Sequence, residues 1–275
     1  MIAKIKANFS TIILVFILLV GLSFLLYPTV SDYWNSFHQS EAIAGYVDKV
    51  NNLTQQENDR MLADAKAYND SLAKNSLPDL NLTAEERTSY NQILDVSDTG
   101  IMAYVDIPKI KTTMPIYHGT DAEILQVAIG HIPGTSLPIG GKGTHAVISG
   151  HRGLPSAKLF TDLDQLVEGD IFYIQVLDQT LTYEVDQILT VTPDDVSPLT
   201  IDPDQDYVTL VTCTPYGVNS HRLLVRGHRI ANEAKEARVT SEASQVDPIL
   251  VAPFIAGLLL LVIPIFLSFK KRFFR

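Results

Sequence analysis

The stretch Tyr207-Val-Thr-Leu-Val-Thr-Cys213 is a run of β-forming residues that ends at the only cysteine of the chain, directly before Thr214-Pro215. Because β-branched and aromatic residues favour extended structure and proline marks a turn, the stretch is predicted to be a strand with Cys213 at its end. A cysteine there can reach a groove, although a free cysteine is also commonly a small buried hydrophobic residue. Which of the two holds depends on the residues that the fold brings to Cys213.

Short runs of the same type lie on both sides of this stretch and are separated by glycine, proline and aspartate. They cover residues 101–107, 114–117, 145–149, 170–176, 181–192 and 222–230. Seven or so strands at this spacing, without long helical patterns between them, are typical of a closed or nearly closed β-barrel. We therefore predict a mainly β domain over residues 101–231.

Residues 32–100 have a different pattern and are predicted to form a helical extension. Apolar residues recur at helical spacing from Ile43 onward. Thr54-Gln-Gln-Glu57 and Thr83-Ala-Glu-Glu86 are capping-box patterns, so helices are expected to begin near residues 55 and 84. The proline-containing residues 75–82 between them are predicted to form a loop.

Each end of the chain holds an uncharged apolar run, 18 residues long at 9–26 and 21 residues long at 249–269. At about 1.5 Å per residue, each run can cross a hydrocarbon core of about 30 Å. The first run could instead be a cleaved signal peptide and the second a buried core helix. The first exceeds the usual length of a signal peptide's apolar region, and basic residues end the second abruptly. We expect two transmembrane helices, within segments 1–31 and 249–275, with residues 232–248 as a linker.

The charges orient these helices. All 31 acidic residues lie between Asp32 and Asp247, and six of the 21 basic residues lie outside that segment, at the two ends of the chain. By the positive-inside rule both ends are cytoplasmic, so the acidic middle is expected outside the cell on a multi-pass cell-membrane protein. One cysteine excludes an internal disulfide, which suits the surface of a Gram-positive bacterium. The net charge of −10 argues against binding duplex nucleic acid.

Several kinds of site are poorly supported. The seven histidines include no H-x-x-x-H pair and there is no cysteine pair, so no metal site is expected. Gly140-Gly-Lys-Gly143 fails the phosphate-loop spacing, and no Gly-x-Ser-x-Gly elbow is present. The remaining possibility is a site built on a nucleophilic cysteine. It needs a proton acceptor and a positive group for the oxyanion, since a free thiol is only a few per cent ionised at neutral pH.

His151 is the best-placed histidine, because Ser149-Gly-His-Arg-Gly153 follows a predicted strand and opens a flexible loop. It could also be an ordinary loop residue, His145 lies inside a predicted strand, and His131 could belong to a turn. Arg222 opens the strand after Cys213, so antiparallel pairing can bring its guanidinium beside the thiol. Arg226 and Arg229 lie later on that strand, and each of the three arginines could also be a solvated strand-end residue.

At these residues the sequence resembles the sortases. Thr209-Leu-Val-Thr-Cys213 matches the TLxTC signature of that family, with a histidine upstream and an arginine downstream at the expected places. The resemblance is narrower to class C, the pilus-assembling sortases, and runs from about Ala42 to Ile230. The other stretches that carry it are MAYVDIPKI (102–110), PIYHG (115–119), GHIPGTSLP (130–138), THAVISGHRG (144–153) and NSHRLLVRG (219–227).

The resemblance implies a sortase-type barrel and a cysteine transpeptidase that uses no cofactor. Cys213 would be the nucleophile, His151 the acid and base, and Arg222 the transition-state stabiliser. The enzyme would cleave an LPxTG-like sorting signal of a pilin precursor between Thr and Gly through a thioacyl intermediate. A lysine of the next pilin would then resolve that intermediate as an isopeptide bond.

One departure from class C concerns the lid loop, which in that class carries an Asp-Pro-aromatic motif over the cysteine. Here the inter-helix loop reads Leu77-Pro-Asp-Leu-Asn-Leu82, without that motif and without an aromatic residue. We therefore expect no aromatic plug over Cys213. Two other functions stay open: a housekeeping sortase that attaches proteins to cell-wall precursor, and a non-catalytic binding module on the same barrel.

Overall fold

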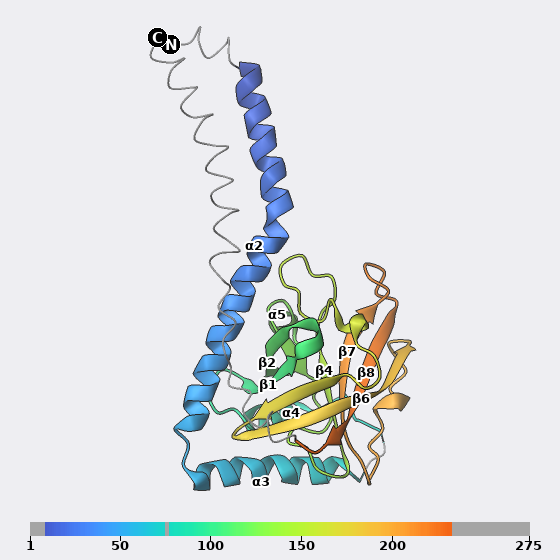
Figure 1. Cartoon of the computed structure of the whole chain (residues 1–275). Helices are drawn as coiled ribbons and strands as arrows, with labels where there is room; N and C mark the ends of the chain where they lie inside the picture. The colour runs from blue at the N-terminus through green and yellow to red at the C-terminus, as the bar shows by residue number, and fades with distance from the viewer. Residues whose placement is uncertain (1–8, 75–76, 233–275) are drawn as a thin grey trace.

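Eight strands close into a barrel, with one long helix along its flank and a second helix across one end (Figure 1). The computed structural model describes residues 9–74 and 77–232. The strand order around the barrel is β1-β2-β3-β4-β7-β8-β6-β5, and β1 pairs with β5 to close it. The strands are β1 (Ile101–Ile107), β2 (Thr112–His118), β3 (Ile129–His131), β4 (Thr144–Ser149), β5 (Ile171–Val176), β6 (Gln179–Val191), β7 (Asp206–Thr214) and β8 (His221–Ile230).

The predicted closed β-barrel is confirmed, and seven of its strands agree with the predicted runs to within two residues at either end. The strand that the sequence did not indicate is β3. It has only three residues, too few for an alternating pattern, and Pro133 follows closely. Its pairing with β2 and β4 is nevertheless what joins the two halves of the barrel.

Within the part of the chain that the structure describes, three helices precede the barrel: α2 (Phe9–Asn51), α3 (Gln55–Leu72) and α4 (Ala84–Gln92). Both predicted capping boxes are present, since Thr54 and Thr83 each exchange hydrogen bonds with the glutamate three residues on. Helix α2 runs through Pro28 and past residue 31, where the sequence suggests a boundary between segments. The first apolar run and the start of the helical extension are therefore one continuous rod.

The C-terminal half of α2 packs on the barrel through Ile43 and Tyr46, which are buried against Ile101 and Tyr104. The Tyr46 hydroxyl donates to the carbonyl of Met102 (3.0 Å) and accepts from the backbone N–H of Leu177 (2.8 Å). These two bonds join β1 to the β5–β6 turn beneath the helix. The direction of α2 relative to the barrel is thus set by buried contacts.

Strands β4 and β7 form the parallel centre of the sheet and are buried on both faces. On the inner face, Ala146, Ile148, Val208 and Leu210 join the main core. On the outer face, Val147 and Val211 pack with Leu199 of the β6–β7 connection. A parallel pair covered on both faces is a rigid support, and the residues that directly follow it are held with little freedom.

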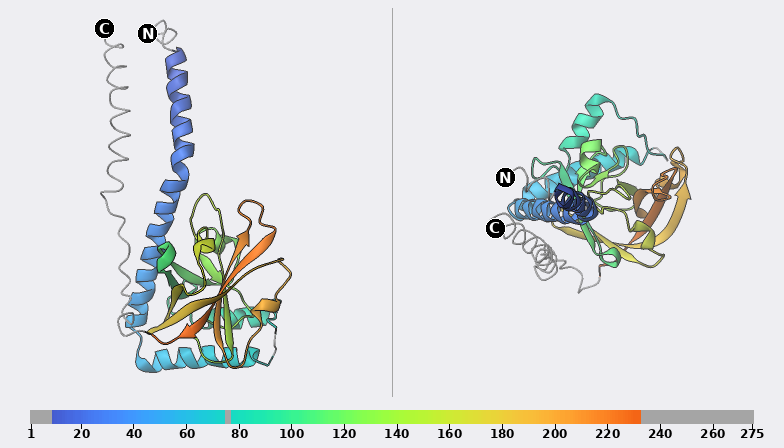
Figure 2. Two further views of the ribbon diagram at one scale, coloured as in Figure 1. Left: turned by 45° about the vertical axis from the view of Figure 1, so that its right-hand side comes forward. Right: turned by 90° about the horizontal axis from the view of Figure 1, so that it is seen from above.

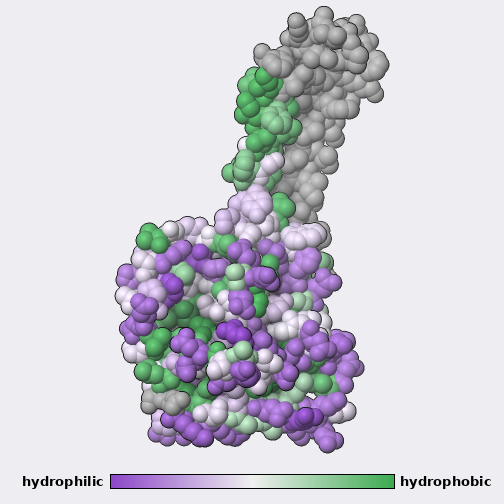
Figure 3. All heavy atoms as spheres, turned by 180° about the vertical axis from the view of Figure 1, so that it is seen from behind, coloured by the Kyte–Doolittle hydropathy of each residue, from purple (hydrophilic) through white to green (hydrophobic). Residues whose placement is uncertain are grey.

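The N-terminal half of α2 is long and apolar enough to cross a membrane, and its most apolar window is not buried in the protein. Figure 3 shows this half as a continuous hydrophobic surface that gives way to hydrophilic surface where the domain begins. The helix is therefore a membrane anchor, with the acidic domain outside. The second apolar run, 249–269, lies outside the described residues, so a multi-pass arrangement stays a prediction.

Candidate active site

Cys213 lies near the end of β7, the strand between β4 and β8, and is partly exposed. Its neighbours on both sides are fixed by the register of the sheet. On β8, Arg222 is its direct antiparallel partner. On β4, Ser149 pairs with Val211 in parallel, so the chain two residues further on reaches the level of Cys213 at His151. Three adjacent strands therefore bring the three predicted site residues to one end of the barrel.

His151 is positioned by the backbone on both sides of it. The N–H of Gly150 donates to the carbonyl of Val211 (3.0 Å), and the hydroxyl of Thr212 donates to the carbonyl of Gly150 (2.8 Å). A side chain on Gly150 would come within 2.7 Å of both Ile129 and Phe160, so only glycine fits there. The His151 carbonyl accepts from the N–H of Phe160 (3.1 Å), which holds the start of the loop.

Arg222 differs from the other two candidate arginines in its partners. Its guanidinium donates only to loop carbonyls, those of Asn219 (3.3 Å) and His221 (3.1 Å), among the contacts found for it. Arg226 instead makes a two-point ion pair with Asp186 (3.0 and 2.8 Å) and lies over the ring of Tyr207. Arg229 donates to Thr182, Ile230 and Asn232 around the end of β8. Arg226 and Arg229 thus have structural partners, whereas Arg222, the strand partner of Cys213, has only the two backbone carbonyls among the contacts found for it.

The two other candidate histidines of the sequence are buried structural residues. His145 donates from Nδ1 to the carbonyl of Thr200 (2.9 Å) and accepts at Nε2 from Thr209 (2.7 Å). His131 donates from Nε2 to the carbonyl of Ser136 (2.7 Å) and accepts at Nδ1 from Tyr90 (2.8 Å). Loss of solvation on burial lowers the pKa of His145 to about 4 and the pKa of His131 to about 3.

These two histidines predict a loss of stability on mild acidification. Their folded-state pKa lies below the unfolded value of about 6.5, so the unfolded chain binds more protons as the pH falls below that value. Between pH 7.0 and 5.5 the free energy of unfolding should fall by on the order of 2 kcal/mol, seen as a lower Tm of the detergent-solubilised chain. In His145→Gln the drop should be about half as large, and an equal drop in the variant would refute the assignment.

Arg152 is a residue of this end that the sequence does not single out. Its side chain is only 11% exposed, donates from Nη1 to the hydroxyl of Thr214 (3.3 Å), and pairs through Nη2 with Asp164. It thereby ties the loop after His151 to the residue after Cys213. Nearby, Gly153 has φ +73°, and the ring of Tyr216 occupies the place that a side chain there would take. In the sequence, Arg152 is indicated only by its position directly after the candidate histidine His151.

The inter-helix loop that corresponds to the lid packs on the barrel beside Gly134. A side chain on Gly134 would come within 1.9 Å of the Asp79 carbonyl oxygen, and Leu82 packs against the main core while Leu80 is 39% exposed. The segment containing Gly134 runs alongside β4 at the level of residues 145–147, several residues before His151. An active site without an aromatic plug over Cys213 stays a prediction.

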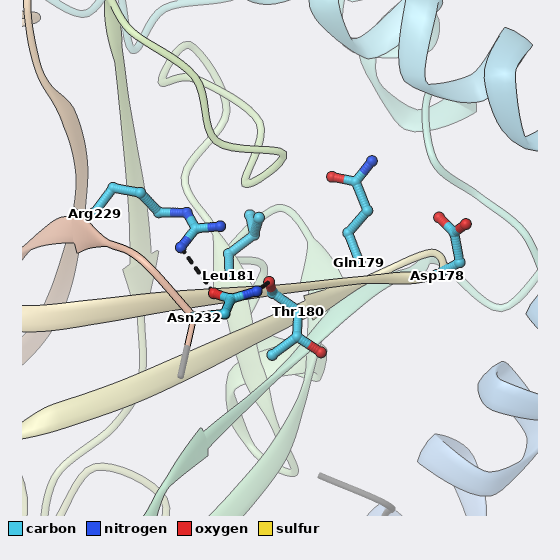
Figure 4. A pocket seen from close by; sticks show the side chains of 6 residues that line it. All are labelled: Asp178, Gln179, Thr180, Leu181, Arg229 and Asn232. Atoms are coloured by element: carbon cyan, nitrogen blue, oxygen red, sulfur yellow. Dashed lines mark hydrogen bonds between the residues drawn. The ribbon is translucent and has the colours of Figure 1, made fainter. Parts of the chain in front are cut away.

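A shallow polar pocket of about 370 Å³ lies at the other end of the barrel (Figure 4). It is formed by the β5–β6 turn and the end of β8, seven residues along β8 from Arg222, and its lining residues are Asp178, Gln179, Thr180, Leu181, Arg229 and Asn232. Arg229 and Asn232 are hydrogen-bonded to each other across it. This pocket is therefore separate from Cys213.

Comparisons with known proteins agree with this geometry. The sortase domain model matches residues 105–230. Sortase D of Bacillus subtilis is 29% identical over 196 residues, which cover 68% of this chain and 92% of that protein. The crystal structure of sortase C1 from Streptococcus agalactiae is 51% identical with a TM-score of 0.68, over 70% of this chain and all of that one. The crystal structure of Streptococcus pneumoniae sortase C is 45% identical with a TM-score of 0.63, over 70% of this chain and 97% of that one.

Proposed function

Because the chain belongs to the sortases, a family of cysteine transpeptidases, we propose that it joins pilin subunits through lysine isopeptide bonds. The observation that carries the proposal is the strand order β4-β7-β8, which brings His151, Cys213 and Arg222 to one level. The high identity to class C structures supports the pilin substrate, since the Streptococcus pneumoniae sortase C acts on pilins.

In the first half-reaction, the Cys213 thiolate attacks the carbonyl carbon of the Thr–Gly bond in an LPxTG-like sorting signal. The carbonyl oxygen becomes an oxyanion, and the Arg222 guanidinium donates hydrogen bonds to it. Collapse of this intermediate breaks the C–N bond, and the His151 imidazolium gives its proton to the departing glycine amine. The product is a thioester between Cys213 and the pilin threonine.

In the second half-reaction, neutral His151 accepts a proton from the lysine ε-amine of the next pilin as that amine attacks the thioester. The C–S bond breaks and the Cys213 thiolate leaves, so the enzyme returns to its starting protonation state. Water would compete with the amine in this step. A site at the membrane anchor meets substrates that are themselves still anchored by C-terminal helices.

The test uses the full chain in proteoliposomes with a purified pilin carrying its sorting signal. We expect a ladder of covalent pilin multimers that resist boiling in detergent, with threonine-to-lysine links found by mass spectrometry. A single attachment to an amine mimic of cell-wall precursor, without a ladder, would instead assign the chain to the housekeeping type.

Thr212→Val offers a test of how His151 is positioned. Valine keeps the shape but cannot donate to the Gly150 carbonyl, so the peptide before His151 loses an anchor. We expect a stability loss of about 1–2 kcal/mol and a roughly tenfold lower kcat in the thioacylation assay.

The matched control for Thr212→Val is Thr209→Val, which removes the bond to His145 four residues before Cys213. It should cost similar stability and leave kcat within about twofold. Equal kcat losses in both variants would mean that the Thr212 bond acts through stability alone.

A further inference from the structure

The barrel is hydrogen-bonded to α2 at the place where the helix leaves the membrane. Asp32 is the first charged residue after the apolar run, and it accepts from the backbone N–H of Lys158 (2.6 Å). On either side of it, Ser31 and Asn35 both donate to the carbonyl of Ser156 (2.9 and 2.6 Å). These three bonds fix the loop after β4, which contains His151, to the juxtamembrane turns of α2.

This attachment sets the distance of the active-site end from the bilayer. Ser31 follows Leu26, the last residue of the apolar run, by five residues, which is about 8 Å along a helix. The headgroup layer of one leaflet is itself about 5–8 Å thick. The bonded part of the β4–β5 loop therefore lies at the outer edge of the headgroup layer, and Figure 2 shows the loops of this end of the barrel turned toward the N-terminal half of α2.

Several large side chains exposed at this end are apolar or aromatic. The β7–β8 loop, residues 215–220, has no charged residue, and its tip exposes Tyr216 (62%) and Val218 (69%). On α2, Trp34 and Phe37, eight and eleven residues after Leu26, are 63% and 57% exposed. Aromatic residues of this kind concentrate at membrane interfaces, where an apolar ring and a polar edge are both satisfied.

Acidic residues limit the extent of this apolar surface. Asp194 and Asp195 are exposed just after β6, whose last residue, Val191, pairs with Arg222. They would be repelled by an anionic leaflet. The apolar surface proposed for membrane contact is that of the β7–β8 loop and the turns of α2 around Trp34.

We propose that this surface docks into the headgroup region of the outer leaflet, so that the end of the barrel that carries Cys213 faces the membrane. The occupant is lipid because the barrel is bonded to the turns of α2 that directly follow the membrane segment, which keeps this end of the barrel close to the bilayer. The anchor and the β7–β8 loop then act as two contact points, which hold the barrel at a fixed orientation. A lipid-anchored or helix-anchored substrate can then reach Cys213 by lateral diffusion in the membrane.

The experiment places a tryptophan at the loop tip and at a control site that is also exposed. In a Trp34→Phe background, Val218→Trp reports on the β7–β8 loop and Leu80→Trp reports on the α3–α4 loop at the opposite end of the domain (Figure 1). The full chain is reconstituted in nanodiscs that contain lipids brominated just below the headgroup. The unmodified chain, whose single tryptophan is Trp34, gives the reference for a side chain on the turns of α2 that follow the membrane segment.

We expect brominated lipid to quench the Val218→Trp emission at least threefold more than the Leu80→Trp emission, and to nearly the extent seen for Trp34. Both variants replace an exposed aliphatic residue by tryptophan, so any membrane affinity of the new side chain is shared. Equal, weak quenching at both sites would overturn the proposal. It would leave the pilin-joining reaction unaffected, since that is judged by the ladder.

Discussion

Cys213→Ala is expected to lower the transpeptidation rate by at least about 10⁴-fold, to the level without enzyme. The chain has one cysteine, so no other thiol can replace the nucleophile. Without a covalent step the barrier rises by at least about 5 kcal/mol, since each factor of ten in rate is about 1.4 kcal/mol. The measurement is the initial rate of lysine-dependent product formation by the full chain in proteoliposomes.

Alanine at position 213 should leave the fold intact, because the side chain is small, partly exposed and lies near the end of β7. Binding of the sorting-signal peptide should persist within about threefold. Full biological function in the Cys213→Ala chain would show that the domain is a non-catalytic binding module. A stability loss large enough to explain the missing product would be visible as a lower Tm.

Arg222→Ala is expected to reduce kcat by about 10²–10³-fold with little change in Tm. Removal of one oxyanion donor in other enzymes has an effect of this size. Within the described residues, the bonds found for Arg222 are the two to the backbone carbonyls of His221 and Asn219, at 3.1 and 3.3 Å, so the folded state loses little. Arg222→Lys should recover only part of the rate, because an ammonium lacks the planar pair of donors of a guanidinium.

Arg226→Ala is the matched control on the same strand. Its loss leaves Asp186 without a partner and removes the contact over Tyr207, so we expect a lower Tm. Its effect on kcat per folded enzyme should stay within about threefold. If Arg226→Ala slowed the reaction as much as Arg222→Ala, Arg222 would have no special place at the oxyanion.

The sequence predicts the barrel and its capping boxes well because those features are local. A strand of six or more residues can be recognised from its composition and from the turn residues at its ends. A capping box needs only four positions. Strand β3 has three residues, and it forms because Gly130 and His131 find partners on β4 that are far away in sequence. No local pattern encodes such a strand.

The sequence indicates the three residues of the candidate site, whose catalytic roles stay a prediction, but it does not reveal the residues that support them. Cys213 and Arg222 are joined by a simple hairpin, so their pairing can be foreseen. The parallel pairing of β4 with β7, which brings His151 beside them, depends on the whole barrel topology. Arg152 could not be distinguished from an ordinary loop arginine, because its bonds to Thr214 and Asp164 depend on that same topology. The continuity of α2 across residue 31 depends likewise on contacts with the barrel, which the change from apolar to charged residues at that point does not reveal.

The proposed mechanism depends on a covalent thioacyl intermediate on Cys213, and mass spectrometry tests for it directly. The full chain is incubated with an LPxTG-type peptide without an amine acceptor, quenched in acid and digested. The mechanism predicts a mass increase equal to the peptide acyl group up to its threonine, located on the fragment that contains Cys213 and lost on addition of a lysine amine. Turnover of the peptide with the adduct on another residue, or with Cys213 unmodified at every time point, would contradict it.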